Sequence, residues 1–490
     1  MSRGQKLTSK REQFYRQRIA GLQAQLKLRD ERISTLQKQA AELLKANQAL
    51  VNKNAELAEQ IAKLSKNSSN SSKPPSSDIV KPPNPKQADG SHRQGGQPGH
   101  KGINRQPFGP NRVDKTIPLY AYSCDCGYVD PGQSIDKPKI QQTVELVDNP
   151  VIITEYHLYG SICPVCGRIV WAKPPAGVIE GQLFGLRLQA LIGYMKGSLH
   201  ASYSALEAFC REVLNINIAR SHLCNTIRRA NNALAEPYDQ LQQHIPTEPV
   251  LNIDESGWKN NGIKYWIWVF CTSAFSFFCI AKSRYSQVLR DILGETYNGT
   301  IVSDFFSAYV KYANKIQQFC LAHLIRDIKF LTTLPNEADK RFARALLTDF
   351  KWLFHIWHLR DKIPKDRFDQ ITCKTRNRIL TVAKQQDLPP KSAAISKRFC
   401  KHGDAMFRFL FDRAVPPTNN AAEQTLRQAI IDRRITQGSR SLTGRQWNAR
   451  IWTVLATCRK QGRSSWQFIQ SALSAYYFRT PTPSLLPQTN

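Results

Sequence analysis

The chain has 490 residues, of which 41% are hydrophobic, and this is enough for a buried core and excludes a disordered protein. Its 69 Lys and Arg outnumber 38 Asp and Glu, and the formal net charge of +31 points to a polyanionic partner, most often nucleic acid, with an anionic membrane as the competing partner. No apolar run reaches the roughly 18 residues of a spanning helix and the N-terminal residues lack the apolar core of a signal peptide, so we expect a cytoplasmic protein with no membrane partner.

Residues 19–64 carry a seven-residue repeat typical of coiled coils. Twelve of its fourteen seam positions suit such a seam, while Arg29 is a clear misfit and Ala40 a weak contributor. Asn47 and Asn54 favour a parallel dimer, because two seam asparagines pair across the axis in one register only. We expect residues 1–65 to form a homodimeric coiled coil; the alternative is a long amphipathic helix packed on its own chain. The seam positions are Ile19, Leu22, Leu26, Arg29, Ile33, Leu36, Ala40, Leu43, Asn47, Leu50, Asn54, Leu57, Ile61 and Leu64.

Residues 66–115 are rich in Ser, Pro, Gly and basic residues and contain almost nothing to bury. This composition is typical of a flexible basic linker. Such a linker could lie along a DNA backbone, and a solvated tether is an equal alternative.

Two cysteine pairs, CDCG and CPVCG, follow within residues 116–175. Each pair offers two thiolates beside a glycine that lets the backbone turn beneath a metal, and the short β-type runs TVELV and VIITEYHLYG lie between the pairs. We expect a small β zinc ribbon with one structural Zn²⁺; the alternative is buried free thiols in a small β unit. The first pair is one residue shorter than the usual spacing. The expected ligands are Cys124, Cys126, Cys163 and Cys166.

Residues 176–245 are expected to be helical, with two amphipathic segments separated by LNIN. The second segment carries Arg220, Arg228 and Arg229, so the pair resembles a helix-turn-helix that binds DNA. Any helical hairpin gives the same pattern, and plain packing therefore remains an equal alternative.

From residue 246 the pattern becomes α/β. VLNID predicts a strand that ends at Asp254, NNG predicts a hairpin turn, and KYWIWVFCTS and FSFFCIA predict two further strands. A helix near SQVLRDIL then precedes the strand GTIVSD, which ends at Asp304. Aspartates on the first and fourth strands of this order are typical of a ribonuclease-H-like core.

The stretch TNNAAEQTLR begins a later helix and supplies a third acid, Glu423. Three converging carboxylates repel one another unless cations lie between them, and Mg²⁺ or Mn²⁺ prefers such oxygen ligands. Two such ions activate the attacking oxygen and stabilise the leaving oxygen in phosphodiester chemistry. Glu255, beside Asp254, is a rival ligand, although strand alternation points it to the other face.

Two basic regions accompany these acids. Between the second and third acids, residues 333–413 are too long for a loop and are expected to form a helical insertion. Residues 340–402 contain 16 Lys and Arg against 5 Asp and Glu, so we expect DNA contact, with a solvated basic helical pair as the alternative. From residue 427 to 463, nine Arg and Lys accompany one acid, which predicts a phosphate-binding surface near Glu423. The expected contacts there are Arg427, Arg433, Arg434 and Arg440.

Ordered motifs along nearly the whole chain resemble those of bacterial DDE transposases of the insertion-sequence-sixty-six family. They are NSSKPPSSD, GGQPGHKG, DESGW, SDFFSAY, CLAHLIRD, TNNAAEQTLR and GSRSLTGRQWNARIWTVLATCRKQG. The resemblance implies a Mg²⁺- or Mn²⁺-dependent enzyme that cuts double-stranded DNA at element ends and joins the 3′ hydroxyls to target DNA, with Asp254, Asp304 and Glu423 as its catalytic triad. It also implies action on the bacterial nucleoid, and it leaves open a higher oligomer on DNA and small accessory proteins of the same element. The alternatives are a catalytically silent DNA-binding regulator and a structure-selective nuclease with the same core.

The sequence as a whole predicts a multidomain α/β protein. The expected parts are a coiled coil (1–65), a linker (66–115), a zinc ribbon (116–175), a helical DNA-binding segment (176–245), a ribonuclease-H-like core in two parts (246–332 and 414–475), a helical insertion between them (333–413) and a tail (476–490).

Overall fold

The computed structural model describes residues 3–66, 106–119, 125–126, 129, 140–148, 150–312 and 316–487. Backbone contacts divide the chain into two units. We call Met1–Lys81 with Gln318–Pro417 the helical unit, and Pro82–Gln317 with Thr418–Asn490 the sheet unit. The chain is thus a mixed α/β protein of more than one unit. Among the described residues, no helix is both long enough and apolar enough to cross a membrane.

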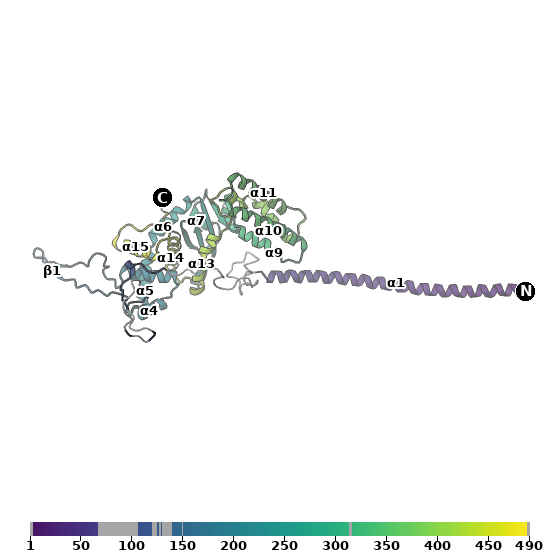
Figure 1. The fold of residues 1–490 in the computed structure, drawn as a ribbon, viewed down its shortest axis with the longest axis horizontal. Coiled ribbons are helices and arrows are strands. Elements are labelled where there is room, and N and C mark those ends of the chain that lie inside the picture. Colours follow the sequence, from purple (N-terminus) through teal and green to yellow (C-terminus); the bar gives the residue numbers. More distant parts are fainter. Residues whose placement is uncertain are drawn as a thin grey trace. The chain divides into compact units, whose positions relative to one another are not determined.

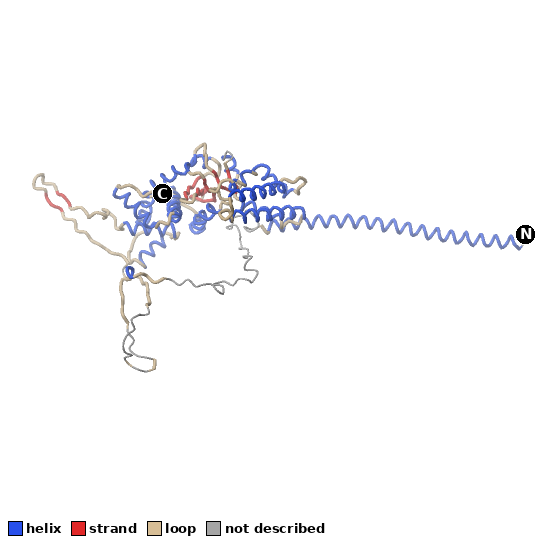
Figure 2. The backbone as a smooth tube through the Cα atoms, turned by 45° about the horizontal axis from the view of Figure 1, so that its top comes forward, coloured by secondary structure: helices blue, strands red, loops and turns tan. Residues whose placement is uncertain are grey.

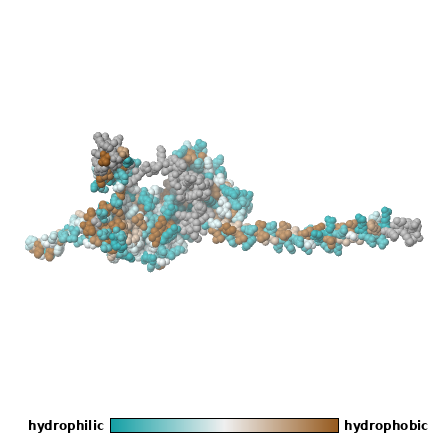
Figure 3. Space-filling view, turned by 60° about the horizontal axis from the view of Figure 1, so that its bottom comes forward, coloured by the Kyte–Doolittle hydropathy of each residue, from teal (hydrophilic) through white to brown (hydrophobic). Residues whose placement is uncertain are grey.

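The helical unit begins with one long helix, α1 (Arg3–Leu64), as the seven-residue repeat predicts. Its seam side chains are exposed in the single chain, for example 60% at Leu26 and 63% at Leu50, and Figure 3 shows apolar groups along the helix. The last turns contact the rest of the unit, because Ala62 is buried and Glu59 Oε1 lies 3.4 Å from Lys391 Nζ. The helix is confirmed, and its pairing with a second copy stays a prediction.

The rest of the helical unit is a small helical bundle around aromatic side chains. Phe350 lies 6.3 Å from Phe399 and 6.4 Å from Phe407 between ring centres. Helix α9 packs on α10 and α12, so the helical segment begins near Gln318 rather than at the expected residue 333. The elements are α9 (Leu321–Leu331), α10 (Glu337–His358), α11 (Lys365–Ala383), α12 (Pro390–His402), η4 (Asp404–Met406) and η5 (Arg408–Leu410).

A mixed sheet lies at the centre of the sheet unit (Figure 2), and its strands there follow the order β5-β4-β3-β6. Strand β3 is antiparallel to β4 and parallel to β6, and β4 is antiparallel to β5. The turn between β3 and β4 uses Asn261 (φ 50°) and Gly262 (φ 78°), as NNG predicts. The strands are β3 (Val250–Asn260), β4 (Ile263–Cys271), β5 (Ser276–Ala281), β6 (Thr300–Ser303) and β7 (Gln317–Phe319).

The expected end of β3 at Asp254 is wrong, because the strand continues to Asn260. Pairing with β4 extends along this whole stretch, from Asn252 opposite Cys271 to Asn260 opposite Ile263, and so keeps β3 extended. The parallel pairing with β6, by contrast, stops at Asn252. Asp254 therefore lies just beyond the last residue that β6 pairs, beside the end of that strand.

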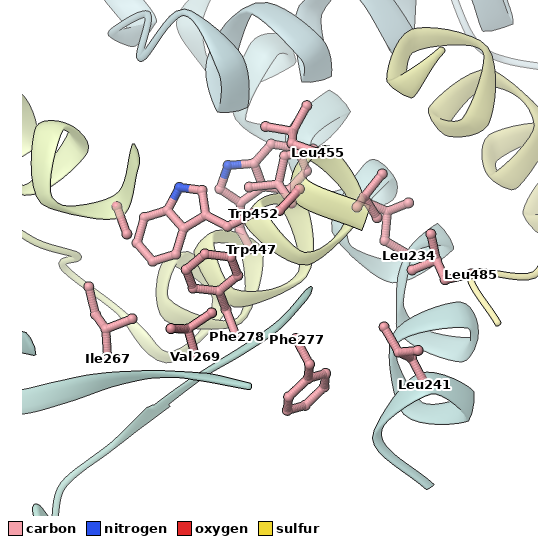
Figure 4. Packing of buried hydrophobic residues seen from close by; sticks show 14 of the residues in the cluster. Leu234, Leu241, Ile267, Val269, Phe277, Phe278, Trp447, Trp452, Leu455 and Leu485 are labelled. Atoms are coloured by element: carbon pink, nitrogen blue, oxygen red, sulfur yellow. The ribbon is translucent and has the colours of Figure 1, made fainter. Parts of the chain in front are cut away.

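Helices cover the sheet, and α13 and α14 pack on β3, β4 and β5 (Figure 1). Trp452 of α14 lies 5.3 Å from Trp258 and 5.8 Å from Phe278 between ring centres, and Figure 4 shows Phe278 beside Trp452. The helices are α3 (Leu186–Ser198), α4 (Tyr203–Glu212), α5 (Arg220–Ala233), α6 (Ala235–His244), η3 (Ile245–Thr247), α7 (Gln287–Leu293), α8 (Ser307–Tyr312), α13 (Asn420–Thr436), α14 (Leu442–Lys460) and α15 (Ser465–Phe478).

The C-terminal residues stay packed beyond the expected boundary at residue 475. Helix α15 continues to Phe478, and Leu485 is fully buried. Gln461 also donates to the Leu485 carbonyl over 2.9 Å. The described part of the expected tail is therefore attached to the sheet unit.

The segment around the second cysteine pair is a short hairpin of β1 (Gly160–Ile162) and β2 (Ile169–Trp171), bordered by long loops in Figure 2. A 3-10 turn, η2 (Pro110–Arg112), precedes it. Within the described residues, TVELV and most of VIITEYHLYG are not strands. Val151 packs against the core, but most of the other apolar side chains are exposed, with Ile152 95% and Ile153 85% accessible, so among the described residues most of the alternating pattern has no pairing strand.

Candidate active site

The structure brings together the three acids that the sequence singles out. Asp254 lies on β3, Asp304 follows the last residue of β6, and Glu423 lies in the first turn of α13. Burial raises the pKa of Asp254 well above its usual range, and the negative charges of Glu255, Asp304 and Glu423 raise it further. The three carboxylates therefore share one electrostatic environment, although 169 positions separate the first from the last in sequence.

Burial and nearby negative charges also raise the pKa of Asp304. Burial and then the charge of Glu255 raise its pKa to about 6, although the Phe306 N–H donates to Oδ1 over 2.9 Å and the positive charge of Arg284 opposes the rise. When these carboxyls are ionised, their negative charges repel one another, and this repulsion adds to the rise in the pKa of Asp254 and Asp304. A set of converging carboxylate oxygens fits hard divalent cations such as Mg²⁺ and Mn²⁺, which would relieve this repulsion.

A buried amide pair fixes the start of α13 against β3. Asn419, 1% exposed, donates from Nδ2 to the Ile253 carbonyl over 2.7 Å, and its Oδ1 accepts from Asn252 Nδ2 over 3.0 Å. The Asn419 carbonyl also accepts the Glu423 N–H over 3.1 Å. The turn that carries Glu423 is thus tied to the residue before Asp254. The sequence offered one signal for this contact, a polar Asn252 inside the apolar run VLNID.

Arg433 makes a second tie between the same two elements. Its Nη1 donates to Ser256 Oγ over 3.0 Å and to the Gly257 carbonyl. Burial, and next the charge of Arg434, lowers the pKa of Arg433. The Nη1 end of Arg433 is therefore bonded to β3 because α13 lies along that strand, and the expected DNA contact of Arg433 stays a prediction.

Glu255 is held on the opposite face of the sheet from Asp254. Its Oε1 accepts from Arg284 Nη2 over 2.6 Å, and its Oε2 accepts the hydroxyl of Tyr309 on α8. Ser256, the next residue, contacts Arg433 of α13 on the other face. Glu255 is therefore a buried ion-pair partner with both carboxylate oxygens already bonded, so Asp254, Asp304 and Glu423 stay the predicted ligands.

Replacing Asn419 with alanine should lower strand cleavage by about a hundredfold, because small displacements of a catalytic group carry penalties of that order. The change also leaves Asn252 buried without its partner and should destabilise the fold by about 1–3 kcal/mol. Single-turnover cleavage against Mg²⁺ concentration and a thermal melt measure both effects. Asn420→Ala is the matched control, since Asn420 is the exposed neighbour on the same helix. Unchanged cleavage in Asn419→Ala would show that the amide pair does not position Glu423.

The second cysteine pair forms a compact knuckle within the β1–β2 hairpin. Cys163 N–H donates to the Arg168 carbonyl over 2.9 Å, and Gly167 turns at φ 69° with its N–H bonded to the Cys163 carbonyl. Backbone N–H groups of Cys166 and Val165 lower the pKa of Cys163, which favours the thiolate that a metal binds. Cys126 is exposed, and Cys124 lies outside the described residues, so the joining of the two pairs stays a prediction.

The two helices of the expected DNA-binding segment are present as α4 and α5, and Asn215 at φ 52° lies in the turn between them. Arg220 and Arg228 are exposed on α5, and Arg220 Nε pairs with Glu207 over 2.7 Å. Arg229 is half-buried among packed helices. Two of the three expected arginines therefore lie on the accessible side of α5.

The remaining basic residues expected near Glu423 are accessible. Arg427 and Arg434 are exposed on α13, and Arg440 is exposed just after it. These three positions are therefore accessible at the surface of the sheet unit.

Comparison with known families gives two matches. Residues 181–446 match the family described as Transposase IS66 family, a range that holds all three acids and covers more than half of the chain. Residues 11–106 match a family of unknown function, DUF6444, and this range covers most of α1. No curated protein matches the chain at a significant level.

Proposed function

Because the chain belongs to the Transposase IS66 family, we propose that it is a DDE transposase that cuts DNA strands at element ends and joins the freed 3′ hydroxyls to target DNA. The observation that supports this chemistry most is the convergence of Asp254, Asp304 and Glu423 at one edge of the mixed sheet. The strand order and the positions of the acids also support a ribonuclease-H-like core.

Asp254, Asp304 and Glu423 would together hold two divalent ions. When bound, Mg²⁺ or Mn²⁺ supplies activation of the attacking oxygen and stabilisation of the leaving oxygen of the phosphodiester. The carboxylates themselves offer hard oxygen ligands, and their mutual repulsion keeps the site favourable for cations. The Asn419 hydrogen bond fixes the start of α13, and with it Glu423, against β3. The third ligand is therefore in position without a movement of α13 on DNA binding.

The reaction is a pair of displacements at phosphorus. In cleavage, a water oxygen bonds to the phosphorus and the 3′ oxygen of the element end leaves as a hydroxyl. In joining, that 3′ hydroxyl oxygen bonds to a target phosphorus and displaces the 3′ oxygen of the target strand. No covalent bond to the protein forms at either stage.

The partner in both stages is double-stranded DNA. Exposed Arg220, Arg228, Arg427, Arg434 and Arg440 would contact its phosphates, and such contacts position the duplex without reading its sequence. Because the substrate is DNA, the bacterial nucleoid is the expected working place. We further propose a homodimer through α1, which on DNA would place two element ends in one assembly.

Incubating the purified protein with labelled element ends tests this function. With Mg²⁺ we expect nicks at the element ends that leave 3′ hydroxyls, and with EDTA we expect none. Binding without nicks would favour the catalytically silent regulator instead. Nicks at branched or mismatched DNA in place of the ends would favour a structure-selective nuclease.

A charged residue in the α1 seam should turn a dimer into a monomer. Leu36 occupies a seam position, where an aspartate would be buried against its counterpart, so Leu36→Asp should halve the mass measured by sedimentation. Leu28→Asp is the control, because Leu28 is 71% exposed on the same helix but lies off the seam. Dimers in both variants, or monomers in the wild type, would exclude the coiled coil.

Purified protein should contain about one zinc per chain, and Cys163→Ser should lose it, because serine does not supply a thiolate. Elemental analysis provides the measurement. Cys373→Ser is the control, since Cys373 is an exposed cysteine of α11 outside both pairs. Zinc-free wild-type protein that folds and binds DNA fully would contradict the zinc ribbon.

A further inference from the structure

Arg284 lies at the edge of the carboxylate cluster, in the loop between β5 and α7. Its Nε and Nη2 atoms both donate to Glu255 Oε1, over 2.9 and 2.6 Å. The guanidinium carbon lies 3.9 Å from the ring centre of Phe306 and 4.6 Å from that of Trp266. These contacts on three sides hold the guanidinium in one orientation.

The ion pair with Glu255 occupies only some of the N–H donors of the Arg284 guanidinium. A guanidinium carries five N–H groups, and the two bonds to Glu255 account for two of them. The side chain of Glu255 is 1% exposed and its other oxygen accepts from Tyr309, whereas the side chain of Arg284 is 37% exposed. The ion pair is therefore buried on the Glu255 side, and the outer edge of Arg284 faces solvent.

Arg284 is close enough to Asp304 for its positive charge to lower the pKa of that carboxyl. Phe306, on which the guanidinium stacks, donates its N–H to Asp304 Oδ1 over 2.9 Å. A DNA strand that reaches the cluster meets the negative charges of Asp254, Asp304 and Glu423. A fixed guanidinium at this edge opposes that repulsion, and its planar fork matches the oxygens of a phosphate.

We propose that Arg284 binds a backbone phosphate of the DNA strand held at the carboxylate cluster, and that Glu255 and Phe306 orient its guanidinium for this contact. The ligand is a phosphodiester anion. The inference rests on the proposed function, because that function brings a DNA strand to Asp304. Glu255 then has a defined role of its own, as the residue that orients the phosphate-binding guanidinium of Arg284.

A binding cycle tests this contact without requiring catalysis. The probes are element-end duplexes that each carry one neutral methylphosphonate at a different position across the end, titrated by gel shift with Mg²⁺ at fixed salt. Both proteins carry Glu423→Gln so that the DNA stays intact, and one also carries Arg284→Gln. In the protein that retains Arg284, we expect the methylphosphonate to weaken DNA binding about tenfold at one or two adjacent positions. In the protein that carries Arg284→Gln, the same methylphosphonate should weaken binding less than about twofold. Equal losses at every position in both proteins would overturn the proposal.

A second variant separates DNA contact from loss of the buried ion pair. Glu255→Gln/Arg284→Gln keeps two amides that hydrogen bond and leaves no buried charge unpaired. It should match Arg284→Gln in the cycle, and a restored tenfold loss would show that Arg284 acts through structure alone. A wild type that never cuts element ends would contradict the proposed function, whereas the binding cycle decides the role of Arg284 independently.

Discussion

Replacing Glu423 with glutamine is expected to abolish strand cleavage and strand joining together. Glutamine keeps the size and the helix propensity of the side chain but removes the charge that holds a divalent ion against its hydration shell. Losing several kcal/mol of transition-state stabilisation corresponds to a fall of about a thousandfold or more in rate. DNA binding should survive, because the phosphate contacts come from Lys and Arg elsewhere, and the loss of one repelling charge even favours it slightly.

The control for Glu423→Gln must be a Glu-to-Gln change at an exposed glutamate outside the carboxylate cluster. Glu255→Gln is unsuitable, since Glu255 is the buried partner of Arg284 and Tyr309. Glu236 is exposed on α6 in the same unit, so Glu236→Gln is expected to cleave normally. Cleavage of a labelled end in Mg²⁺ and a gel shift at fixed salt measure the two effects. Near-normal cleavage by Glu423→Gln would contradict its assignment as the third ligand.

The metal-free protein should become more stable when Asp304 is replaced by asparagine, although the enzyme loses its activity. A carboxyl whose pKa rises from 3.8 to about 6 carries its charge in the folded state at a cost of about 3 kcal/mol at most. Asparagine removes that charge and still accepts the Phe306 N–H. In EDTA at pH 8, Asp304→Asn should therefore melt a few degrees above wild type. With Mg²⁺ the wild type should gain stability that the variant does not.

The pH dependence of the wild type follows from the same raised pKa. Because the folded state binds the proton more tightly than the unfolded state, protonation of Asp304 stabilises the fold. This contribution is complete below the ordinary pKa of 3.8 and is lost as the pH rises through about 6. In EDTA, the wild type should thus lose stability relative to Asp304→Asn between about pH 4 and 6. A constant difference in melting temperature across that range would contradict the account.

Periodic features of the sequence predict much of this fold. The seven-residue repeat gives α1, and the turn NNG with its flanking apolar runs gives β3, β4 and β5. Asp304 after β6 and Glu423 in the first turn of α13 follow from the same patterns, because strand ends and helix starts have local signatures. Local sequence patterns alone therefore single out these acids.

Local sequence patterns do not predict the features that depend on residues far apart in the chain. The length of β3 depends on its pairing with β4, and the described residues around the second cysteine pair form the short β1–β2 hairpin in place of the longer strands that the pattern predicts. The bond from Asn419 to the Ile253 carbonyl joins residues 166 positions apart, and Arg433 reaches Gly257 across 176. Arg433 illustrates the limit, since the sequence alone does not show that its guanidinium bonds to β3.

The central claim is that these acids join DNA strands, and a joining assay tests it most directly. A labelled, pre-cut element end with a free 3′ hydroxyl is incubated with purified protein, Mg²⁺ and a target plasmid. We predict labelled plasmid with the end attached through its 3′ oxygen, and none with a 3′-dideoxy end or with Glu423→Gln. Protein that nicks the plasmid in Mg²⁺ but never attaches the labelled end would contradict the assignment as a strand-transferring transposase.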